Sequence, residues 1–126
     1  MPSVQIVERI IGANYLDSLA IKGWRDKVRG VAISALSLAS VPDYTVYGVR
    51  NSKGTLLGLA ALRINDQDVQ LLHMASRDVG REIRSLLICD IDKIYDKRIK
   101  VIPDPIDVSF YEYIGWRKVG KEYWSR

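Results

Sequence analysis

Two parts of this 126-residue sequence contain residue types suited to chemistry, and the first surrounds Gly80. Three arginines, Arg77, Arg81 and Arg84, flank this glycine where the clearest amphipathic helix of the sequence begins. The first N–H groups of a helix have no intrahelical partner and form the positive end of its dipole, and glycine lets an anion approach closely. The stretch therefore fits either an anion-binding turn or a turn glycine followed by a solvated basic helix face.

The second part is residues 107–120, near the C-terminus. Phe110, Tyr111 and Ile114 recur at helical spacing, Gly115 ends the helix, and residues 116–119 alternate as a strand does. The pattern predicts a short helix that leads directly into a strand. An aromatic pair on such a helix commonly packs into the core, because each ring buries a large apolar area.

Residues 110–120, Phe-Tyr-Glu-x-x-Gly-Trp-Arg-Lys-Val-Gly, resemble the FYxxxGF segment of the GNAT acyltransferase superfamily. Members of this family move an acyl group from coenzyme A to an amine. The resemblance implies that Tyr111 lies near the thioester sulfur and protonates the departing thiolate. It also implies that backbone N–H groups around Leu72, His73 and Met74 pair with the pantetheine arm and help polarise the thioester carbonyl.

In this family the turn before the long helix carries Arg/Gln-x-x-Gly-x-Gly/Ala, and its amide groups hold the pyrophosphate of coenzyme A. In one register this sequence matches at Arg77 and Gly80 but has Glu82 at a position for a small residue. In a register shifted by two, Asp78 takes the place of the first glycine and Ala75 that of the arginine. Either register places an acid in the loop, so the loop is degenerate.

The resemblance implies that amide groups of this turn and the three arginines are the phosphate partners. The predicted cofactor-binding residues are Leu72, His73, Met74, Arg77, Val79, Gly80, Arg81 and Arg84.

Acyl transfer to an amine requires a neutral amine, donors for the oxyanion and an acid for the leaving thiolate. The predicted catalytic residues are Tyr111 as the acid and His73 as the base. His73 is the only titratable side chain in the middle of its predicted strand, and imidazole accepts protons near neutral pH. A hydrogen-bonded core histidine is the alternative interpretation. Cys89 falls in the middle of a helix, away from both motifs, so direct attack is expected rather than an acyl-enzyme.

The elements that must position these residues follow from periodicity and turn signals. Strands are predicted at residues 3–10, 44–50, 55–65, 69–75, 99–102 and from 116 onward, with helices near 14–23, 24–39, 81–98 and 107–115. The order β-α-α-β-β-β-α-β-α-β is that of the GNAT fold. We therefore expect an α/β (α+β) protein with a mixed, mainly antiparallel, twisted sheet and helices on both faces. It should form one GNAT-like acyltransferase domain over residues 1–126.

The stretch after Gly120 leaves room for one strand, where GNAT proteins usually add a closing hairpin. The edge formed by residues 117–124 would then be unpaired, and we expect a homodimer through this C-terminal strand. Trp116 and Trp124 would be buried there.

Composition excludes several classes of protein. Hydrophobic residues make up 48% and charged residues 27%, no apolar run is long enough for a membrane helix, and Glu8 and Arg9 interrupt any secretory leader. The expected location is the cytoplasm. With one cysteine and one histidine, no metal site is expected. The net charge of +4 suits an anionic ligand, but basic and acidic residues are interleaved, so no nucleic acid is expected.

The predicted function is N-acyl transfer, with acetyl-CoA as donor and an amine-bearing small molecule or protein as acceptor. A GNAT-fold protein without coenzyme A activity, serving as a binding or regulatory module, is the alternative, and Asp78 and Glu82 are the residues that favour it. A small basic nucleic-acid-binding domain is a third hypothesis, which a steep salt dependence of binding would reveal.

Overall fold

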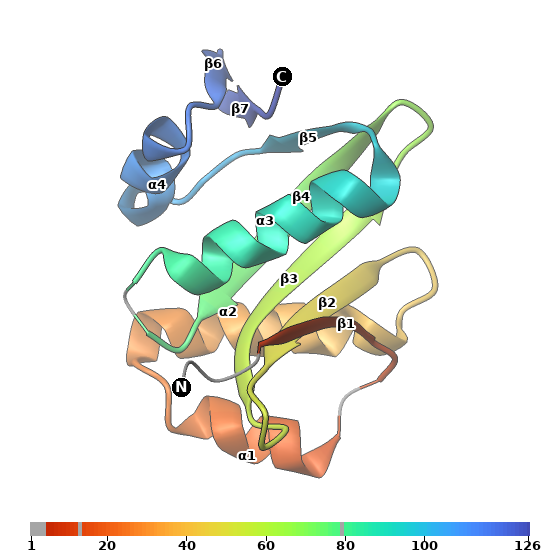
Figure 1. The fold of residues 1–126 in the computed structure, drawn as a ribbon, viewed down its shortest axis with the longest axis vertical. Helices are drawn as coiled ribbons and strands as arrows, with labels where there is room; N and C mark the ends of the chain where they lie inside the picture. Colours follow the sequence, from red (N-terminus) through yellow and green to blue (C-terminus); the bar gives the residue numbers. More distant parts are fainter. Residues whose placement is uncertain (1–4, 13, 79) are drawn as a thin grey trace.

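The computed structural model describes residues 5–12, 14–78 and 80–126, apart from the side chain of Ile106, and these residues form seven strands and four helices. The strands are Ile6–Ile10 (β1), Thr45–Arg50 (β2), Leu56–Ile64 (β3), Asp68–Ser76 (β4), Arg98–Val101 (β5), Arg117–Val119 (β6) and Glu122–Trp124 (β7). The helices are Tyr15–Lys22 (α1), Asp26–Ser37 (α2), Glu82–Tyr95 (α3) and Val108–Tyr113 (α4), with 3-10 turns at Leu38–Ser40 and Pro105–Asp107. All strands belong to one sheet in the order β1-β2-β3-β4-β5-β7-β6 (Figure 1).

Helices cover both faces of this sheet, as expected. One buried cluster joins α1 and α2 to residues of β2, β3 and β4, and a second joins α3 and α4 to residues of β2, β3, β4, β5 and β7. The central strand β3 is buried along residues 56–62, because its alternating side chains supply apolar surface to both clusters. The predicted fold class is confirmed, and only the β4–β5 pair in the sheet is parallel among the described strands.

Helix α3 lies unusually close to the sheet at Gly58 in β3. A Cβ atom at this position would collide with the side chain of Ile83 and would lie 3.2 Å from the carbonyl oxygen of Ala75. Only glycine leaves room here, so this position fixes how closely the first turn of α3 approaches β3.

The strands β4 and β5 separate after a short paired stretch. Their parallel pairing runs only from Asp68 opposite Arg98 to Leu71 opposite Val101, whereas β4 continues to Ser76. β5 ends because Pro103 and Pro105 follow it, and proline has no N–H to donate to a neighbouring strand. Among the described strands, residues 72–76 of β4 consequently have no partner on the side facing β5 (Figure 1).

The C-terminus corrects one prediction. Residues 117–124 form two strands instead of one, because Gly120, with φ of +63°, allows a tight turn between β6 and β7. β7 then pairs with both β5 and β6. The closing hairpin is present, so the reason for which we expected a homodimer is wrong. Self-association itself stays a prediction.

Smaller boundaries also differ from the sequence prediction. The third helix ends at Tyr95 instead of residue 98, so Arg98 begins β5. The second helix is regular only over Asp26–Ser37 and ends in the 3-10 turn, and the part of the first strand at residues 3 and 4 lies outside the described residues. Trp116 packs against the core under α4, whereas Trp124 lies on β7 with the side chains of Arg98 and Lys100 from β5 beside its ring. The two rings do not form a shared patch.

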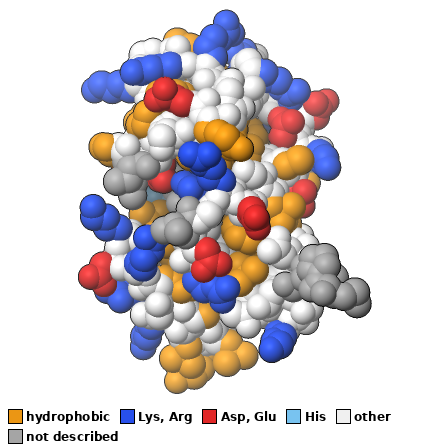
Figure 2. Space-filling model, turned by 60° about the vertical axis from the view of Figure 1, so that its left-hand side comes forward, with side chains coloured by type: hydrophobic (Ala, Val, Ile, Leu, Met, Phe, Trp, Pro, Cys, Tyr) orange, Lys and Arg blue, Asp and Glu red, His pale blue; other side chains and the backbone are white. Residues whose placement is uncertain are grey.

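The surface carries both signs of charge. On the face seen in Figure 2, Lys and Arg side chains are interleaved with Asp and Glu, and apolar side chains gather at the end formed by α1. Tyr15 and Leu16 of this helix are exposed. Within the described part of the chain, no helix combines the length and apolar character needed to cross a bilayer.

A buried ion pair ties α1 to the sheet. The carboxylate of Asp17, whose residue is 3% exposed, accepts two hydrogen bonds of 2.7 Å from the guanidinium of Arg50 on β2. Arg50 also pairs with Glu8 of β1. Asn14 caps the start of α1, because its side chain accepts a 2.8 Å hydrogen bond from the Asp17 N–H.

We predict that Asp17→Asn lowers the free energy of unfolding by about 1 to 3 kcal/mol, because Arg50 loses a buried bidentate partner but keeps Glu8. Urea denaturation at pH 7 measures this loss. Asp26→Asn is the matched control, because Asp26 pairs with Arg29 on an exposed helix surface and its loss should cost about 0.5 kcal/mol or less. Equal losses in the two variants would contradict the importance of the buried pair.

Candidate active site

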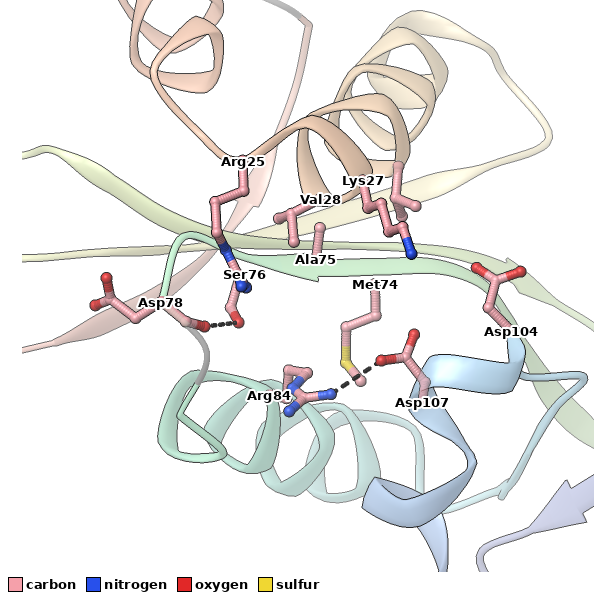
Figure 3. Close-up of a pocket in the computed structure, with 11 residues that line it drawn as sticks. Arg25, Lys27, Val28, Met74, Ala75, Ser76, Asp78, Arg84, Asp104 and Asp107 are labelled. Atoms are coloured by element: carbon pink, nitrogen blue, oxygen red, sulfur yellow. Dashed lines mark hydrogen bonds and ion pairs between the residues drawn. The ribbon is translucent and has the colours of Figure 1, made fainter.

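A groove opens where β4 and β5 separate, bounded by α2 on one side and by the segment from β5 to α4 on the other. It consists of an inner cavity of about 390 Å³ and an outer cavity of about 200 Å³. Five residues line both cavities: Lys27, Val31, Met74, Asp104 and Asp107. Figure 3 shows the outer cavity, with β4 running between α2 above and α3 below.

A β-bulge at Leu72 decides which side chains of β4 enter this groove. Leu71 pairs with Leu62 and His73 with Ala61, so Leu72 is an extra residue between them. Leu71 packs in the core under α3, whereas the partner of His73, Ala61, belongs to the core under α2. Without the bulge, residues 71 and 73 would share a face. The bulge therefore turns His73 towards α2 and the inner cavity, where Leu72 and Met74 also lie.

Tyr111 reaches the same inner cavity from the opposite face of the sheet. Its ring packs edge-on against Phe110 at 5.2 Å and lies 5.0 Å from Trp116 and 6.2 Å from Tyr123, measured between centroids. The residue is 2% exposed, and it lines the cavity with His73. The ring is part of the core, as one interpretation of the sequence expects, and one side of it borders the groove. Its catalytic role stays a prediction.

Burial raises the pKa of Tyr111 well above its ordinary value of about 10, and the negative charge of Asp107 adds to the rise. The hydroxyl therefore carries its proton at neutral pH, and the raised pKa makes it a weaker acid than an exposed tyrosine. The start of its helix is fixed by the 3-10 turn Pro105–Asp107, and the end by Gly115 with φ of +82°, a conformation that favours glycine.

An ion pair connects α3 to the start of α4 across the outer cavity. Nη1 of Arg84 lies 3.1 Å from Oδ1 of Asp107 (Figure 3). The guanidinium stands 4.4 Å from the centroid of the Phe110 ring. The Nε atom of Arg84 is buried and has no hydrogen-bond partner within the described part of the chain. Burial raises the pKa of the Asp107 carboxyl, Arg84 lowers it, and Asp104 raises it.

The predicted phosphate loop lies at the start of α3. Gly80 has no positive φ, and a Cβ there would meet no atom within 4 Å, so neither strain nor crowding requires a glycine. Arg77 pairs with Asp78 at 3.4 Å, and both border a separate cavity of about 260 Å³ with Gly80 and Glu82. Glu82 is the first residue of α3.

The structure thus divides the predicted site residues. Leu72, His73, Met74 and Tyr111 line the inner cavity, and Arg84 lines the outer one. Arg77 and Gly80 border the third cavity, and the guanidinium of Arg81 covers the ring of Tyr113 at 4.0 Å. Val79 lies outside the described residues.

Sequence reasoning missed four charged residues of the groove, namely Arg25, which lines the outer cavity, and Lys27, Asp104 and Asp107, which line both cavities. Lys27 comes from the first turn of α2, and Asp104 and Asp107 come from the stretch before α4. The alternation of proline and aspartate just before the Tyr111 segment was the only local signal for these carboxylates. Lys27 gave no signal, because its helix shows an ordinary exposed face. Ser34 of the same helix also lines the inner cavity.

Comparison with known proteins places this geometry in context. No family model matches the sequence, and no curated protein matches it. Solved structures do match over nearly the whole chain. The structure of aminoglycoside 6′-acetyltransferase type Ii has a TM-score of 0.69 at 14% identity, with 94% of each chain covered. This chain has the GNAT fold.

Two further structures show how widely this fold is shared. The PaiA N-acetyltransferase from Thermoplasma acidophilum, in complex with coenzyme A, has a TM-score of 0.62 at 14% identity, with 96% of each chain covered. The ribosomal-protein-S18-alanine N-acetyltransferase from Escherichia coli has a TM-score of 0.55 at 13% identity, covering 92% of this chain and 79% of the other. At these identities the likeness establishes the GNAT fold alone.

The described residues of this GNAT fold include no ligand set for a metal ion. No group of three or more His, Cys, Asp or Glu side chains there is arranged to hold an ion. Cys89 lies exposed on α3, and no cavity described above includes it.

We predict that Arg84→Gln destabilises the protein at pH 7 by about 1 to 3 kcal/mol, because the partly buried carboxylate of Asp107 loses its cation. The folded-state pKa of Asp107 should rise further in this variant. A carboxyl whose folded pKa exceeds its unfolded value loses stability as the pH rises from about 4 towards that pKa. The deficit should therefore be small at pH 4 and larger at pH 7.

Thermal unfolding of both proteins across this pH range measures the effect. Arg81→Gln on the same helix is the control and should change stability little, because Arg81 is exposed and lies against an exposed tyrosine ring. A deficit in Arg84→Gln that does not depend on pH would contradict the role of Asp107.

Proposed function

We propose that the protein is an N-acyltransferase that moves an acetyl group from acetyl-CoA to an amine by direct attack. The observation that carries the proposal is the inner cavity, in which the unpaired edge of β4 and the hydroxyl-bearing ring of Tyr111 meet where β4 and β5 separate. The GNAT fold of N-acetyltransferases, one of them solved with coenzyme A, supports it.

The residues present fit the thioester end of the donor well. Residues 72–76 of β4 have backbone groups without a strand partner on the β5 side, so they are available to an amide-containing arm. These groups border a cavity to which Leu71, Val101 and Ile102 contribute apolar side chains and Lys27, Asp104 and Asp107 contribute charged ones. Acetyl-CoA would supply the activated acyl carbon.

The phosphate end of the donor fits less well. Arg77 is paired with Asp78 and Arg84 with Asp107, so a diphosphate would have to compete with two carboxylates for these cations. Glu82 adds a third negative charge at the start of α3, where the helix dipole would otherwise favour an anion. We infer that coenzyme A binds weakly compared with a site that has the small residues usual in this turn.

The chain's own residues can then perform each proton movement. In the proposed step the amine nitrogen bonds to the thioester carbonyl carbon, and the carbon–sulfur bond breaks. His73, on the α2 side of the cavity, accepts the proton that the amine loses. Tyr111, on the opposite side and protonated at neutral pH, gives its proton to the leaving thiolate. Backbone N–H groups at residues 72–74 are the candidate donors to the oxyanion.

A GNAT-fold protein that no longer binds coenzyme A is the second candidate. The two arginine–aspartate pairs favour it, because they neutralise the cations that would attract a diphosphate. Such a protein would use the groove for a different ligand and would transfer no acyl group.

We predict that Tyr111→Phe keeps the fold and acetyl-CoA binding but slows transfer about 10- to 1,000-fold, because only the proton donor is removed. Transfer is measured by release of free thiol, with a panel of primary amines as acceptors and with thermal unfolding as the check on folding. Phe110→Leu is the control, because it changes the neighbouring ring without removing a hydroxyl. An unchanged rate in a well-folded Tyr111→Phe protein would leave Tyr111 as a core residue only.

We predict that acetyl-CoA raises the melting temperature, because a ligand that binds only the folded state stabilises it. Glu82→Gln should increase that rise and tighten binding about 10-fold, since it removes one negative charge beside the diphosphate. Arg77→Ala should have the opposite effect. Titration calorimetry on the three proteins provides the affinities. No heat and no thermal shift in any of them would exclude the enzyme and favour the binding module.

A further inference from the structure

The face of β5, β7 and β6 that points away from α3 and α4 carries an unusual row of side chains. The core under α3 and α4 takes alternate residues of β5 and β7, namely Ile99, Val101 and Tyr123. Strand geometry therefore places the intervening residues on the opposite face. These include Arg98, Lys100, Arg117 and Trp124, and we call this surface the open face.

No described helix covers the open face. The core under α2 contains residues of β1, β2, β3 and β4 but none of the described residues of β5, β6 or β7. The sheet continues beyond β4 while its helical layer on this side stops there. The open face therefore lies uncovered, directly beside the groove.

A tryptophan lies at the centre of the open face, between cations. Register places Lys100 and Arg117 on either side of Trp124 as direct cross-strand neighbours. The Arg98 guanidinium lies 4.7 Å and the Lys100 ammonium 5.5 Å from the centroid of its indole. Cations that stack on an indole hold it in place and remain able to bind an anion from the solvent side.

Two carboxylates offset part of this charge. Asp68 of β4 pairs with Lys100 at 3.5 Å, and Glu122 lies two residues before Trp124 on the same strand. Arg98 and Arg117 are exposed and have no ion pair with any other described residue, so they supply the available positive charge. The open face is thus suited to a ligand with a few negative charges. Its row of cationic side chains is short for a nucleic acid.

The open face is continuous with the inner cavity. β5 leads from Lys100 directly to Val101 and Ile102, which line that cavity. At about 3.3 Å per residue, Ile102 lies roughly 7 Å further along the strand than Lys100. An extended peptide whose amino terminus enters the cavity would place its third or fourth residue over the cation row.

We propose that the acceptor is the free amino terminus of a polypeptide that is acidic within its first residues, and that the open face holds this acidic segment. The inference rests on the proposed acyl transfer and adds to it the class of acceptor. Arg98 and Arg117 bind the carboxylates, and Trp124 packs against the aliphatic part of the peptide. The reaction at the peptide amine is the one described above.

The test compares three peptides with free amino termini and a C-terminal fluorophore: Ser followed by three Glu, three Gln or three Lys, in an otherwise identical sequence. Fluorescence anisotropy measures their binding to the full chain. We expect the Glu peptide to bind about tenfold more tightly than the Gln peptide, from two exposed charge contacts, with the difference shrinking at 0.5 M salt. The Lys peptide should bind least tightly.

The double variant Arg98→Ser, Arg117→Ser should abolish the preference for the Glu peptide. Lys121→Ser is the matched control, because this lysine lies in the turn of the same hairpin, off the row, and should leave the preference unchanged. In transfer assays with acetyl-CoA, the double variant should raise KM for the Glu peptide about tenfold without changing kcat. For a small amine without other charged groups, KM and kcat should both stay unchanged.

Equal binding of the three peptides, or the same preference in the double variant, would overturn the proposal. So would tighter binding of an oligothymidylate than of the Glu peptide, which would mark a nucleic-acid surface. Binding of the Glu peptide without its acetylation, while small amines are acetylated, would overturn the acceptor assignment alone. Absence of transfer to every amine, with the peptide preference intact, would instead contradict the proposed enzyme.

Discussion

The separation of β4 from β5 is the constraint on which the rest of the site depends. Four residues of parallel pairing hold the two strands together, and the prolines that follow β5 prevent it from continuing. Beyond that point β4 has backbone groups without a strand partner. Such groups need another hydrogen-bond partner, and a ligand can supply it. Here the gap is lined from both faces of the sheet, by His73 on one and Tyr111 on the other. Neither side chain would reach the gap if the strands stayed paired.

The charges at the groove and at the start of α3 do not favour strong binding of coenzyme A. An arginine near a phosphate-binding helix start is useful only if its charge is available, and both Arg77 and Arg84 have carboxylate partners. The Arg84–Asp107 pair also anchors the turn that begins α4, and so it helps to hold Tyr111 at the cavity. In the proposed enzyme, this single arginine would therefore serve both the structure and ligand binding. A ligand that draws it away from Asp107 must offset the cost of leaving that carboxylate partly buried.

The acceptor side is less determined by the fold than the donor side. Solved GNAT structures of similar shape include an aminoglycoside acetyltransferase and an acetyltransferase of a ribosomal protein, so the shape of the sheet alone does not select the amine. This chain has an uncovered surface beside the groove, with a tryptophan that cations flank. Side chains on strands that the second helical layer does not reach are free to vary in charge without loss of core packing. The proposed choice of acceptor depends on such side chains.

The sequence by itself determined the fold class, nearly all element positions and the Tyr111 segment, because these depend on local periodicity and on turn residues such as Gly115 and Pro103. It did not reveal the closing hairpin, since strands as short as β6 and β7 carry too few residues for a periodic signal. Only the tertiary structure showed that Leu72 is a bulge that turns His73 towards α2, and that Asp107 and Lys27 meet in one groove. These outcomes depend on pairing between residues far apart in the chain, and burial of Asp17 against Arg50 has the same origin. Local patterns determine what an element is, whereas contacts between distant elements decide which of its side chains face a ligand.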